Sequence, residues 1–342
     1  MSVTRQPAFF EINAAADFLG PGAIEVPMFA PQILDMVRRR GVLGQRIKKE
    51  PSTGQPGRYF EQTRIVTGTF QDPRSMAFTP GQDPTRRERY VTMKAIYSSI
   101  QFSMFDVEVT RQQGMFAQLV AKDIEDAVEG ALKTSDLALW NGTDTSLILP
   151  TTLEYVGGLT QINRTASIAS TMRIIDGLKA EIASLVANTQ FKVQPTAVYG
   201  NPILWDLVDQ EERLNQRQIP QTMLNTVTGG LMVNALATQA GLIPIIPDPF
   251  LLNGPTGGST SESGKTDYKA VILSEPLVEY QYITSPDPRV FQLGLQGGLA
   301  TMFGIPLFGA VVYKGVANAS QSQGTLESGA VCYAHSVITV VR

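Results

Sequence analysis

The residues of this sequence that could do chemistry are few, and the most suggestive run is GSTSESGKT, from Gly258 to Thr266. It looks like a phosphate-binding P-loop because it ends in Gly-Lys-Thr. A P-loop has four residues between its glycines, so that successive backbone N–H groups close around the phosphate. Here five residues separate Gly258 from Gly264, and a strand-like segment follows where a helix should begin. We therefore expect an ordinary loop, with a nucleotide-binding enzyme as a remote alternative.

No other set of side chains supports catalysis or metal binding. The chain has one histidine, His335, and one cysteine, Cys332, which cannot form a Ser-His-Asp or Cys-His set. Two such ligands without a neighbouring carboxylate cannot close a structural zinc site. The carboxylates clustered after Trp205 fall on the exposed side and end of a predicted helix. We expect no catalytic residue, no metal and no cofactor, and hence not an enzyme.

The longest helical pattern runs from Val107 to Gly142. Its apolar residues recur at three- and four-residue spacing and therefore share one face. These residues are Phe116, Leu119, Val120, Ile124, Ala127, Val128, Ala131 and Leu132. Two oppositely charged pairs lie four residues apart on the other face: Lys122 with Asp126, and Glu129 with Lys133. At ~1.5 Å per residue this predicts a strut on the order of 45 Å long.

A long β-hairpin is predicted before this helix. Its strands run from Tyr59 to Phe70 and from Tyr90 to Met104, around a tip rich in Pro, Gly and Asp. A two-stranded ribbon alone is marginally stable in water, so we expect it to lie on a neighbouring subunit. The second strand changes its apolar phase near Ala95, as expected where a projecting arm returns to the body and becomes buried.

The rest of the chain predicts a mixed α+β body. Residues 1–27 read as an extended arm, and Pro31 opens a short helix that ends at Arg40. Ser170 or Thr171 is expected to cap a second amphipathic helix. Further elements are a strand from Pro195 to Tyr199, a helix from Pro202 capped by Asn201, and strands at Leu242–Ile246, Tyr268–Leu273, Val278–Ile283, Val290–Leu295, Leu307–Tyr313 and Val331–Val341.

Composition and charge favour a globular chain without a membrane span. The 342 residues are 43% hydrophobic and 17% charged, with a formal net charge of −3. Val290 to Tyr313 is free of charge over 24 residues, long enough for a transmembrane helix. It also contains two glutamines, Pro306 and five glycines, which raise the cost of insertion. We expect two buried strands, divided around Gly304-Ile305-Pro306.

Six basic residues lie within a window of twelve that contains no acid. They are Arg38, Arg39, Arg40, Arg46, Lys48 and Lys49. Such a cluster could contact phosphate or an acidic partner. It could equally be the solvated end of a helix, since basic residues are favoured there. The sequence leaves both interpretations open.

The order of these parts resembles that of the major capsid proteins of tailed phages with the Hong Kong 97 fold, over nearly the whole chain. The segments that carry the resemblance are LALWNGTD at the end of the long helix, then PTAVYGNPILWDLVDQ, GLIPIIPDPF, KAVILSEPLVEYQYI and PLFGAVVYKGVA. Encapsulins, shells of the same fold, are similar too. The long polar hairpin and the arm favour the phage capsid over this alternative.

The resemblance implies a domain division for the α+β chain. It comprises an N-terminal arm (1–30), a short helix with the basic segment (31–50), an E-loop hairpin (51–104), a peripheral domain with the spine helix (105–165 and 305–342) and a mixed α/β axial domain (166–304). The implied function is that of a head subunit that self-assembles into an icosahedral shell enclosing phage DNA.

The implied partners are copies of the same chain, in pentamers and hexamers, and packaged double-stranded DNA. A portal and separate scaffolding or decoration proteins are also implied, since Met1 leads directly into an arm. The expected location is the virion capsid, assembled in the host cytoplasm. Some relatives crosslink an E-loop lysine to an asparagine, but Arg58 to Met93 contains no lysine and Lys94 falls in a strand. We therefore do not expect this crosslink.

Charge suggests which surfaces meet between subunits. From Arg58 to Lys94, seven basic and four acidic residues give a net charge of +3. From Val107 to Asn141, three basic and six acidic residues give −3. We expect the hairpin of one subunit to lie across the long helix of the next, because complementary charge sets the register of an interface. The expected contact residues are Arg86, Arg87 and Arg89 on the hairpin and Asp123, Glu125, Asp126 and Glu129 on the helix, and the basic cluster at 38–49 is expected on the inner face.

Overall fold

The computed structural model divides into two units, residues 1–38 and 39–342, of which the first lies outside the described residues. It describes residues 40–52, 54, 57–64, 66, 68, 70–74, 85–105, 116–143, 154–187, 192–214, 223–228, 231–252, 266–296, 300–315 and 333–342. The predicted arm, the helix from Pro31, Arg38, Arg39, the hairpin tip at 75–84, the loop 253–265 and Cys332 lie outside these residues. The elements below belong to the second unit.

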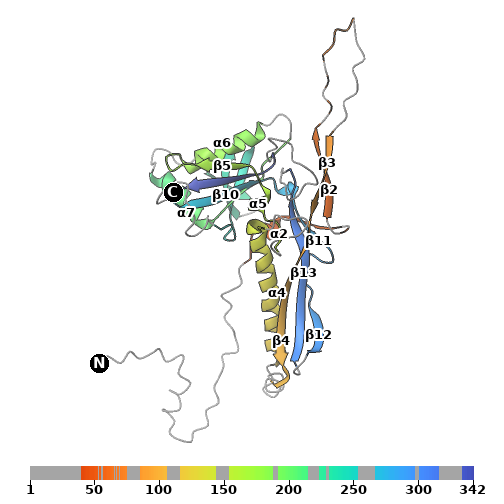
Figure 1. The fold of residues 1–342 in the computed structure, drawn as a ribbon. Helices are drawn as coiled ribbons and strands as arrows, with labels where there is room; N and C mark the ends of the chain where they lie inside the picture. Colours follow the sequence, from red (N-terminus) through yellow and green to blue (C-terminus); the bar gives the residue numbers. More distant parts are fainter. Residues whose placement is uncertain are drawn as a thin grey trace, which may run out of the picture. The chain divides into compact units, whose positions relative to one another are not determined.

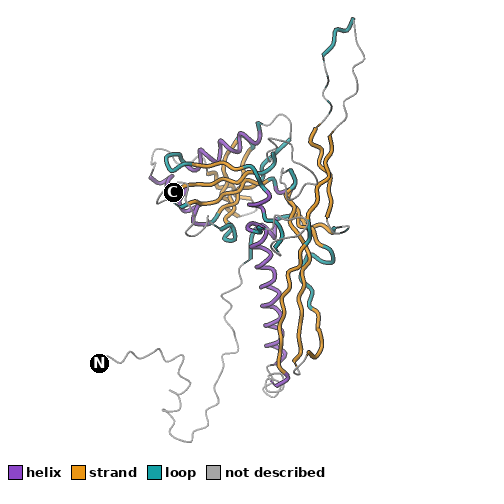
Figure 2. Tube along the Cα trace, in the orientation of Figure 1, coloured by secondary structure: helices purple, strands orange, loops and turns teal. Residues whose placement is uncertain are grey.

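A five-stranded sheet forms one half of this unit (Figure 1). Its strands run in the order β1 (Lys48–Pro51), β11 (Val278–Tyr282), β13 (Ala300–Tyr313) and β12 (Phe291–Gln296), with β4 (Lys94–Ser103) paired to β13. Strand β13 has 14 residues and is paired on both sides, so it is the central strand. Helix α4 (Phe116–Asn141) packs along β4 and β13, as Figure 2 shows.

A seven-stranded sheet forms the other half. Its order is β5 (Thr165–Ile168), β14 (Ser336–Val341), β10 (Asp267–Leu273), β6 (Ala197–Gly200), β9 (Gly241–Pro247), β8 (Leu231–Thr238) and β7 (Met223–Thr228). Helices α6 (Ile174–Val186) and α7 (Pro202–Leu214) cover one face, where Leu178 and Leu204 share a core with Ile272. Alternate residues such as Val271 face a second core that includes Trp140 of α4.

The predicted hairpin is present, with shorter strands than expected. Strand β2 (Gly57–Arg64) pairs antiparallel with β3 (Thr85–Val91), in a register that sets Gly57 opposite Val91. The second predicted strand is in fact two, because β4 leaves the hairpin at Lys94 and pairs with β13. The change of apolar phase near Ala95 therefore marks a real transfer of the chain from the ribbon to the five-stranded sheet.

Local patterns predicted the helices well, with one wrong cap. Helix α4 has 26 described residues, and Lys122 pairs with Asp126 at 3.2 Å as expected. Asn201 caps α7, its Oδ1 accepting the Ile203 N–H at 3.0 Å. Neither Ser170 nor Thr171 caps α6: the helix begins at Ile174, whose N–H donates to Glu211 on α7 at 3.0 Å. The remaining short helices are α2 (Leu43–Arg46), α5 (Gly158–Gln161) and a 3-10 turn at Glu275–Leu277.

The uncharged run at 290–313 forms strands, but β12 is not buried as expected, since Phe291 and Leu293 are exposed, and the run divides elsewhere. The break lies between β12 and β13, and Gly304-Ile305-Pro306 continues within β13. On the side of β13 away from β4, pairing with β12 ends at Gly304 and pairing with β11 begins at Gly309. Pro306 therefore has no strand partner on this side among the described residues, and a proline is tolerated there. Within the described part of the chain, no helix combines the length and apolar character that a membrane crossing requires.

The two sheets group the chain differently from the expected domain boundaries. Strand β13, from Ala300 to Tyr313, lies in the five-stranded sheet against which α4 packs. Strand β14, assigned with 305–342 to the peripheral domain, lies in the seven-stranded sheet between β5 and β10. Strands β11 and β12, assigned to 166–304, lie in the five-stranded sheet. Because the chain crosses between the sheets more than once, linear boundaries cannot separate them.

The buried carboxylate of Asp248 ties three segments together where the two halves meet. One oxygen, Oδ2, accepts hydrogen bonds from the Trp140 indole Nε1 at 3.0 Å and the Leu43 backbone N–H at 3.2 Å. The other, Oδ1, accepts from the Phe250 N–H at 3.0 Å. Trp140 packs against Tyr199 of β6, with ring centroids 5.3 Å apart. Asp248 thereby joins the end of α4, the start of α2 and the turn after β9.

Replacing Asp248 by alanine should strongly destabilise the subunit. The change would leave three buried donors without acceptors, each at a cost of about 1 kcal/mol or more, so we expect the free energy of unfolding to fall by about 3 kcal/mol or more. Urea unfolding followed by circular dichroism measures this. Asp206→Ala, on the exposed side of α7, is the matched control and should change stability by less than about 0.5 kcal/mol. Equal stability of the two variants would contradict the role assigned to Asp248.

His335 is a second buried polar link, and it predicts a pH dependence. Its Nδ1 accepts the Ser274 N–H at 3.2 Å, and its Nε2 donates to the Lys314 carbonyl at 2.9 Å. Burial lowers the pKa of His335 to about 4. Between pH 6.5 and 4 the unfolded chain therefore binds a proton that the folded chain does not, so stability falls as the pH falls, by about 3 kcal/mol in all.

The prediction is checked by comparing unfolding free energies at pH 7 and pH 4.5 for the wild type and His335→Gln. Glutamine can both donate and accept but does not titrate. The variant should lose less stability than the wild type across this range, the shared carboxylate titrations cancelling in the comparison. Parallel pH profiles would show that His335 does not contribute.

Candidate functional site

The root of the β2–β3 hairpin is fixed by a buried acid–base pair. Arg89 Nε donates to Glu61 Oε2 at 2.6 Å, and the two side chains are 4% and 7% exposed. The other carboxylate oxygen of Glu61 accepts the Gly315 N–H, in the turn after β13, at 2.5 Å. Arg89 was expected to face a neighbouring subunit. Its place within its own chain removes it from the exposed contact residues.

Lys314 completes this root beside Glu61. Its ammonium group donates to Glu279 of β11 at 2.5 Å and lies 5.7 Å from the centre of the Tyr59 ring. Burial, followed by the negative charge of Glu61, raises the pKa of Tyr59 well above its usual range. Tyr59 is therefore neutral at physiological pH, and it contributes a cation–π contact. Together these groups set where the hairpin leaves the five-stranded sheet.

The opposite face of the hairpin is exposed and carries an aromatic residue. Phe60 is 74% exposed, and the register places it opposite Glu88. Arg86 is exposed opposite Gln62, and Arg58 pairs with Glu88 at 2.9 Å. The side chain of Arg87 lies outside what the structure describes. On this face of the hairpin, a phenylalanine that the described residues leave exposed therefore lies between basic groups.

The predicted acidic residues on α4 differ in their exposure. Glu125 and Asp126 are exposed, whereas Asp123 and Glu129 are half-buried. Burial raises the pKa of Asp123, with a smaller contribution from the charge of Asp126. Glu129 lies 3.7 Å from Arg40 of its own chain. Glu125 and Asp126 are therefore the members of this set that are best placed to meet another molecule.

The basic cluster is largely neutralised within the chain. Each described member has a carboxylate partner: Arg40 with Asp136 at 3.0 Å, Arg46 with Glu275 at 2.7 Å, Lys49 with Asp287 at 3.5 Å, and Lys48 with Glu50. The guanidinium of Arg46 contacts both carboxylate oxygens of Glu275, which raises the pKa of Arg46. Neither interpretation from the sequence foresaw this, because three of the partners lie far along the chain. Arg38 and Arg39 fall outside the described residues.

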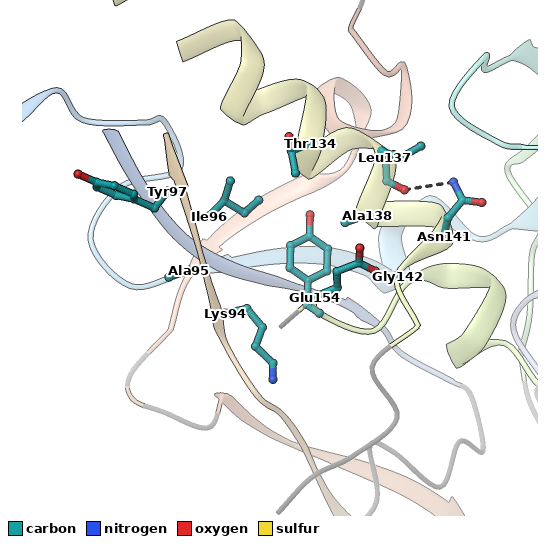
Figure 3. Close-up of a pocket in the computed structure, with 11 residues that line it drawn as sticks. Lys94, Ala95, Ile96, Tyr97, Thr134, Leu137, Ala138, Asn141, Gly142 and Glu154 are labelled. Carbon is teal, nitrogen blue, oxygen red and sulfur yellow. Dashed lines mark hydrogen bonds between the residues drawn. The ribbon is translucent and has the colours of Figure 1, made fainter. Parts of the chain in front are cut away.

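A pocket of about 330 Å³ opens between β4 and the last turns of α4 (Figure 3). The strand supplies residues 94–97, the helix supplies Leu137, Ala138 and Asn141, and Glu154 and Tyr155 complete the wall. Figure 3 shows side chains from the strand on one side and from the helix on the other. The pocket cannot be recognised from the sequence, because its walls come from separate segments of the chain. Among the described residues, no group of three or more His, Cys, Asp or Glu side chains could hold a metal ion.

Comparison with known proteins finds similarity in structure alone. No protein-family model matches the sequence. No curated protein matches it either. Solved structures of shell proteins, in contrast, match nearly the whole chain at low sequence identity. The likeness therefore concerns the fold.

Three of these structures illustrate the match. The capsid of the native GTA particle has a TM-score of 0.61 at 9% identity, over 95% of this chain and 98% of that one. The head of Helicobacter pylori bacteriophage KHP40 has a TM-score of 0.58 at 10% identity, over 97% of each chain. The holo-SrpI encapsulin complex of Synechococcus elongatus has a TM-score of 0.50 at 13% identity, over 95% of this chain and 94% of that one.

These matches agree with the architecture described above. The long helix on its strands, the projecting hairpin and the second sheet with two covering helices occur in one chain, in the order that the sequence resemblance implied. The matches span almost the full length of both chains, so they concern the whole arrangement of parts. The chain has the Hong Kong 97-type fold of phage capsid subunits.

Proposed function

We propose that this chain is the major capsid subunit of a tailed phage, many copies of which assemble into a closed icosahedral shell around double-stranded DNA. The observation that carries the proposal is the full-length likeness to the capsid of the GTA particle and the head of phage KHP40. In this proposal the chain catalyses no reaction, and its function lies in contacts between copies. An exposed ribbon and a charged helix suit such contacts.

A second candidate is the shell of a protein nanocompartment, supported by the likeness to the SrpI encapsulin complex. Both candidates require closed shells made of this chain. They differ in what the shell encloses, which is DNA for a phage head and protein for a nanocompartment. The contents of purified particles therefore separate them.

The proposed contact between subunits places the hairpin of one copy across α4 of the next. Arg86 is exposed on the hairpin, and Glu125 and Asp126 are exposed on the helix. Each exposed ion pair contributes only about 0.2–1 kcal/mol, so charge alone does not hold a shell together. Because the contact recurs at every subunit, it sets register and orientation. Arg89 is left out of this contact since it is buried against Glu61.

Further partners belong to the same proposal. If the chain is a phage capsid subunit, its partners include a portal and separate scaffolding or decoration proteins. Its assembly then takes place in the host cytoplasm. Arg38 and Arg39 are the members of the basic cluster proposed to face packaged DNA at the inner surface, because their described neighbours are paired within the chain. A covalent lysine–asparagine crosslink is not proposed, since Lys94 falls in β4.

The direct test is electron microscopy and sedimentation of the purified chain. We expect closed shells or capsomer rings, because both candidate functions require self-assembly. Nuclease-protected DNA in particles from infected cells would support the phage head, and enclosed protein without DNA would support the nanocompartment. A uniform monomer under all conditions, including coexpression with neighbouring phage genes, would contradict both.

Reversing hairpin charge should impair assembly without unfolding the subunit. We expect Arg86→Glu to lower particle yield at low salt and to matter less at high salt, where exposed charges are screened. Adding Glu125→Lys with Asp126→Lys should restore part of the yield. Sedimentation measures the yield, with circular dichroism as the folding check.

The matched control reverses one basic residue elsewhere, Lys192, which is exposed near the seven-stranded sheet. This variant should assemble normally. If the hairpin variant formed normal shells at low salt, or if the control lost as much yield, the proposed contact would be wrong.

A further inference from the structure

We propose that the pocket between β4 and α4 receives the side chain of Phe60 from the hairpin of a second copy of this chain. This inference rests on the proposed shell function and names the contact that positions one subunit on the next. Three observations support it: the apolar surface of the pocket, the exposure of Phe60, and the charged residues around the pocket and around Phe60.

The middle of the pocket fits an apolar occupant, because the polar groups of Tyr155 and Asn141 in its wall already have hydrogen-bond partners in the same chain. The Tyr155 hydroxyl donates to the Ser135 carbonyl at 2.7 Å, and the Asn141 amide donates to the Leu137 and Phe250 carbonyls at 3.2 and 2.8 Å. Figure 3 shows the bond between Asn141 and Leu137. The surface that a bound side chain would contact is mainly hydrocarbon, from Ile96, Leu137 and Ala138. Contact with this hydrocarbon would cost a polar ligand its hydration, which an apolar side chain does not lose.

Among the described residues of the hairpin, Phe60 is the apolar side chain best suited to enter this pocket. It is 74% exposed although it lies in the middle of β2, where pairing to β3 fixes the backbone. A phenylalanine on a fixed strand loses little freedom on binding, and buried aromatic residues commonly dominate interface energies. Phe70 is also fully exposed, but it lies beyond the last paired residue, Arg64. Because its strand is paired, the backbone of Phe60 is held in place before binding, whereas Phe70 lacks this constraint.

Charge at the edges of the two surfaces is complementary. The exposed acid Glu154 lies at the pocket, and the exposed base Arg86 lies on the same hairpin face as Phe60. Lys94 lines the pocket as well, and the hairpin face carries Glu88 opposite Phe60. The hairpin face thus presents Arg86 and the Arg58–Glu88 ion pair beside Phe60, and the pocket presents Glu154 and Lys94. This arrangement favours one orientation of the hairpin over its reverse.

The partner is a second copy because the two surfaces lie at different places on one chain. Phe60 is exposed, so it does not fill the pocket of its own subunit. A projection and a pocket at separate positions make a heterologous contact, in which each copy gives its projection to one neighbour and its pocket to another. Such contacts close into rings when the rotation allows. Rings of subunits are what the proposed shell requires.

Crosslinking in the assembled state tests the contact directly. On a Cys332→Ser background, Phe60→Cys and Leu137→Cys are introduced together, and particles are treated with a short bifunctional maleimide. We expect covalent dimers and longer ladders on denaturing gels. Each single-cysteine variant should stay monomeric, and so should Ile203→Cys paired with Phe60→Cys, since Ile203 is exposed on α7 away from the pocket.

Assembly yield gives a second readout with a matched control. Phe60→Ala should lower the yield of closed particles at least tenfold at fixed protein concentration, because every subunit contact loses the buried ring. Phe70→Ala removes an exposed ring of equal size and should assemble like the wild type. Circular dichroism and urea unfolding should show both variants folded.

The outcomes separate this inference from the proposed function. Wild-type shells together with an uncrosslinked Phe60–Leu137 cysteine pair, or with normal assembly of Phe60→Ala, would overturn the pocket contact and leave the shell function standing. A wild type that never assembles would contradict both. Ladder formation specific to the Phe60–Leu137 pair, with loss of yield in Phe60→Ala alone, supports the pocket contact.

Discussion

The structure depends on a buried carboxylate, Asp248, where the long helix meets the seven-stranded sheet. Two sheets built from interleaved parts of one chain need a fixed joint, or each would pack independently. Asp248 provides it by accepting from an indole and two backbone N–H groups of three separate segments. Tyr313 reinforces the joint, since its hydroxyl donates to the Leu139 carbonyl at 3.0 Å. Directional hydrogen bonds define one relative orientation, which apolar burial alone does not.

The hairpin root uses buried charge in the same way. Replacing a buried ion pair by apolar residues is often neutral or stabilising, so the Glu61–Arg89 pair is weak evidence for stability. Its geometry gives a different benefit, because Glu61 contacts both the partner strand and the turn at Gly315. Arg89 Nη1 and Glu279 Oε2 are buried without hydrogen-bond partners among the described residues, which adds a cost to this root. We infer that the charges set the direction of the hairpin and that the surrounding apolar core supplies the stability.

Local rules recovered from the sequence those parts that depend on near neighbours. The periodicity of α4, the Asn201 cap and the strand at Asp267–Leu273 each follow from residues within a few positions. The environment of the basic cluster does not follow from near neighbours, because Arg40, Arg46 and Lys49 pair with carboxylates 96, 229 and 238 residues away. The pocket beside α4 was missed for the same reason. Long-range pairing decides which charges stay available, and it cannot be read from a window of twelve residues.

The proposed shell function is spread over surfaces, which fits a fold shared with the similar shells at only 9–13% identity. A catalytic site constrains a few residue types strictly, whereas a core accepts many apolar residues if pattern and volume are kept. Contacts between subunits can also change, provided that both sides change together. In a closed shell the two sides of a heterologous contact lie on the same chain, so one gene carries both the projection and the pocket. In this proposal the joint at Asp248 and the hairpin root matter as well, because they fix where the projection points relative to the pocket.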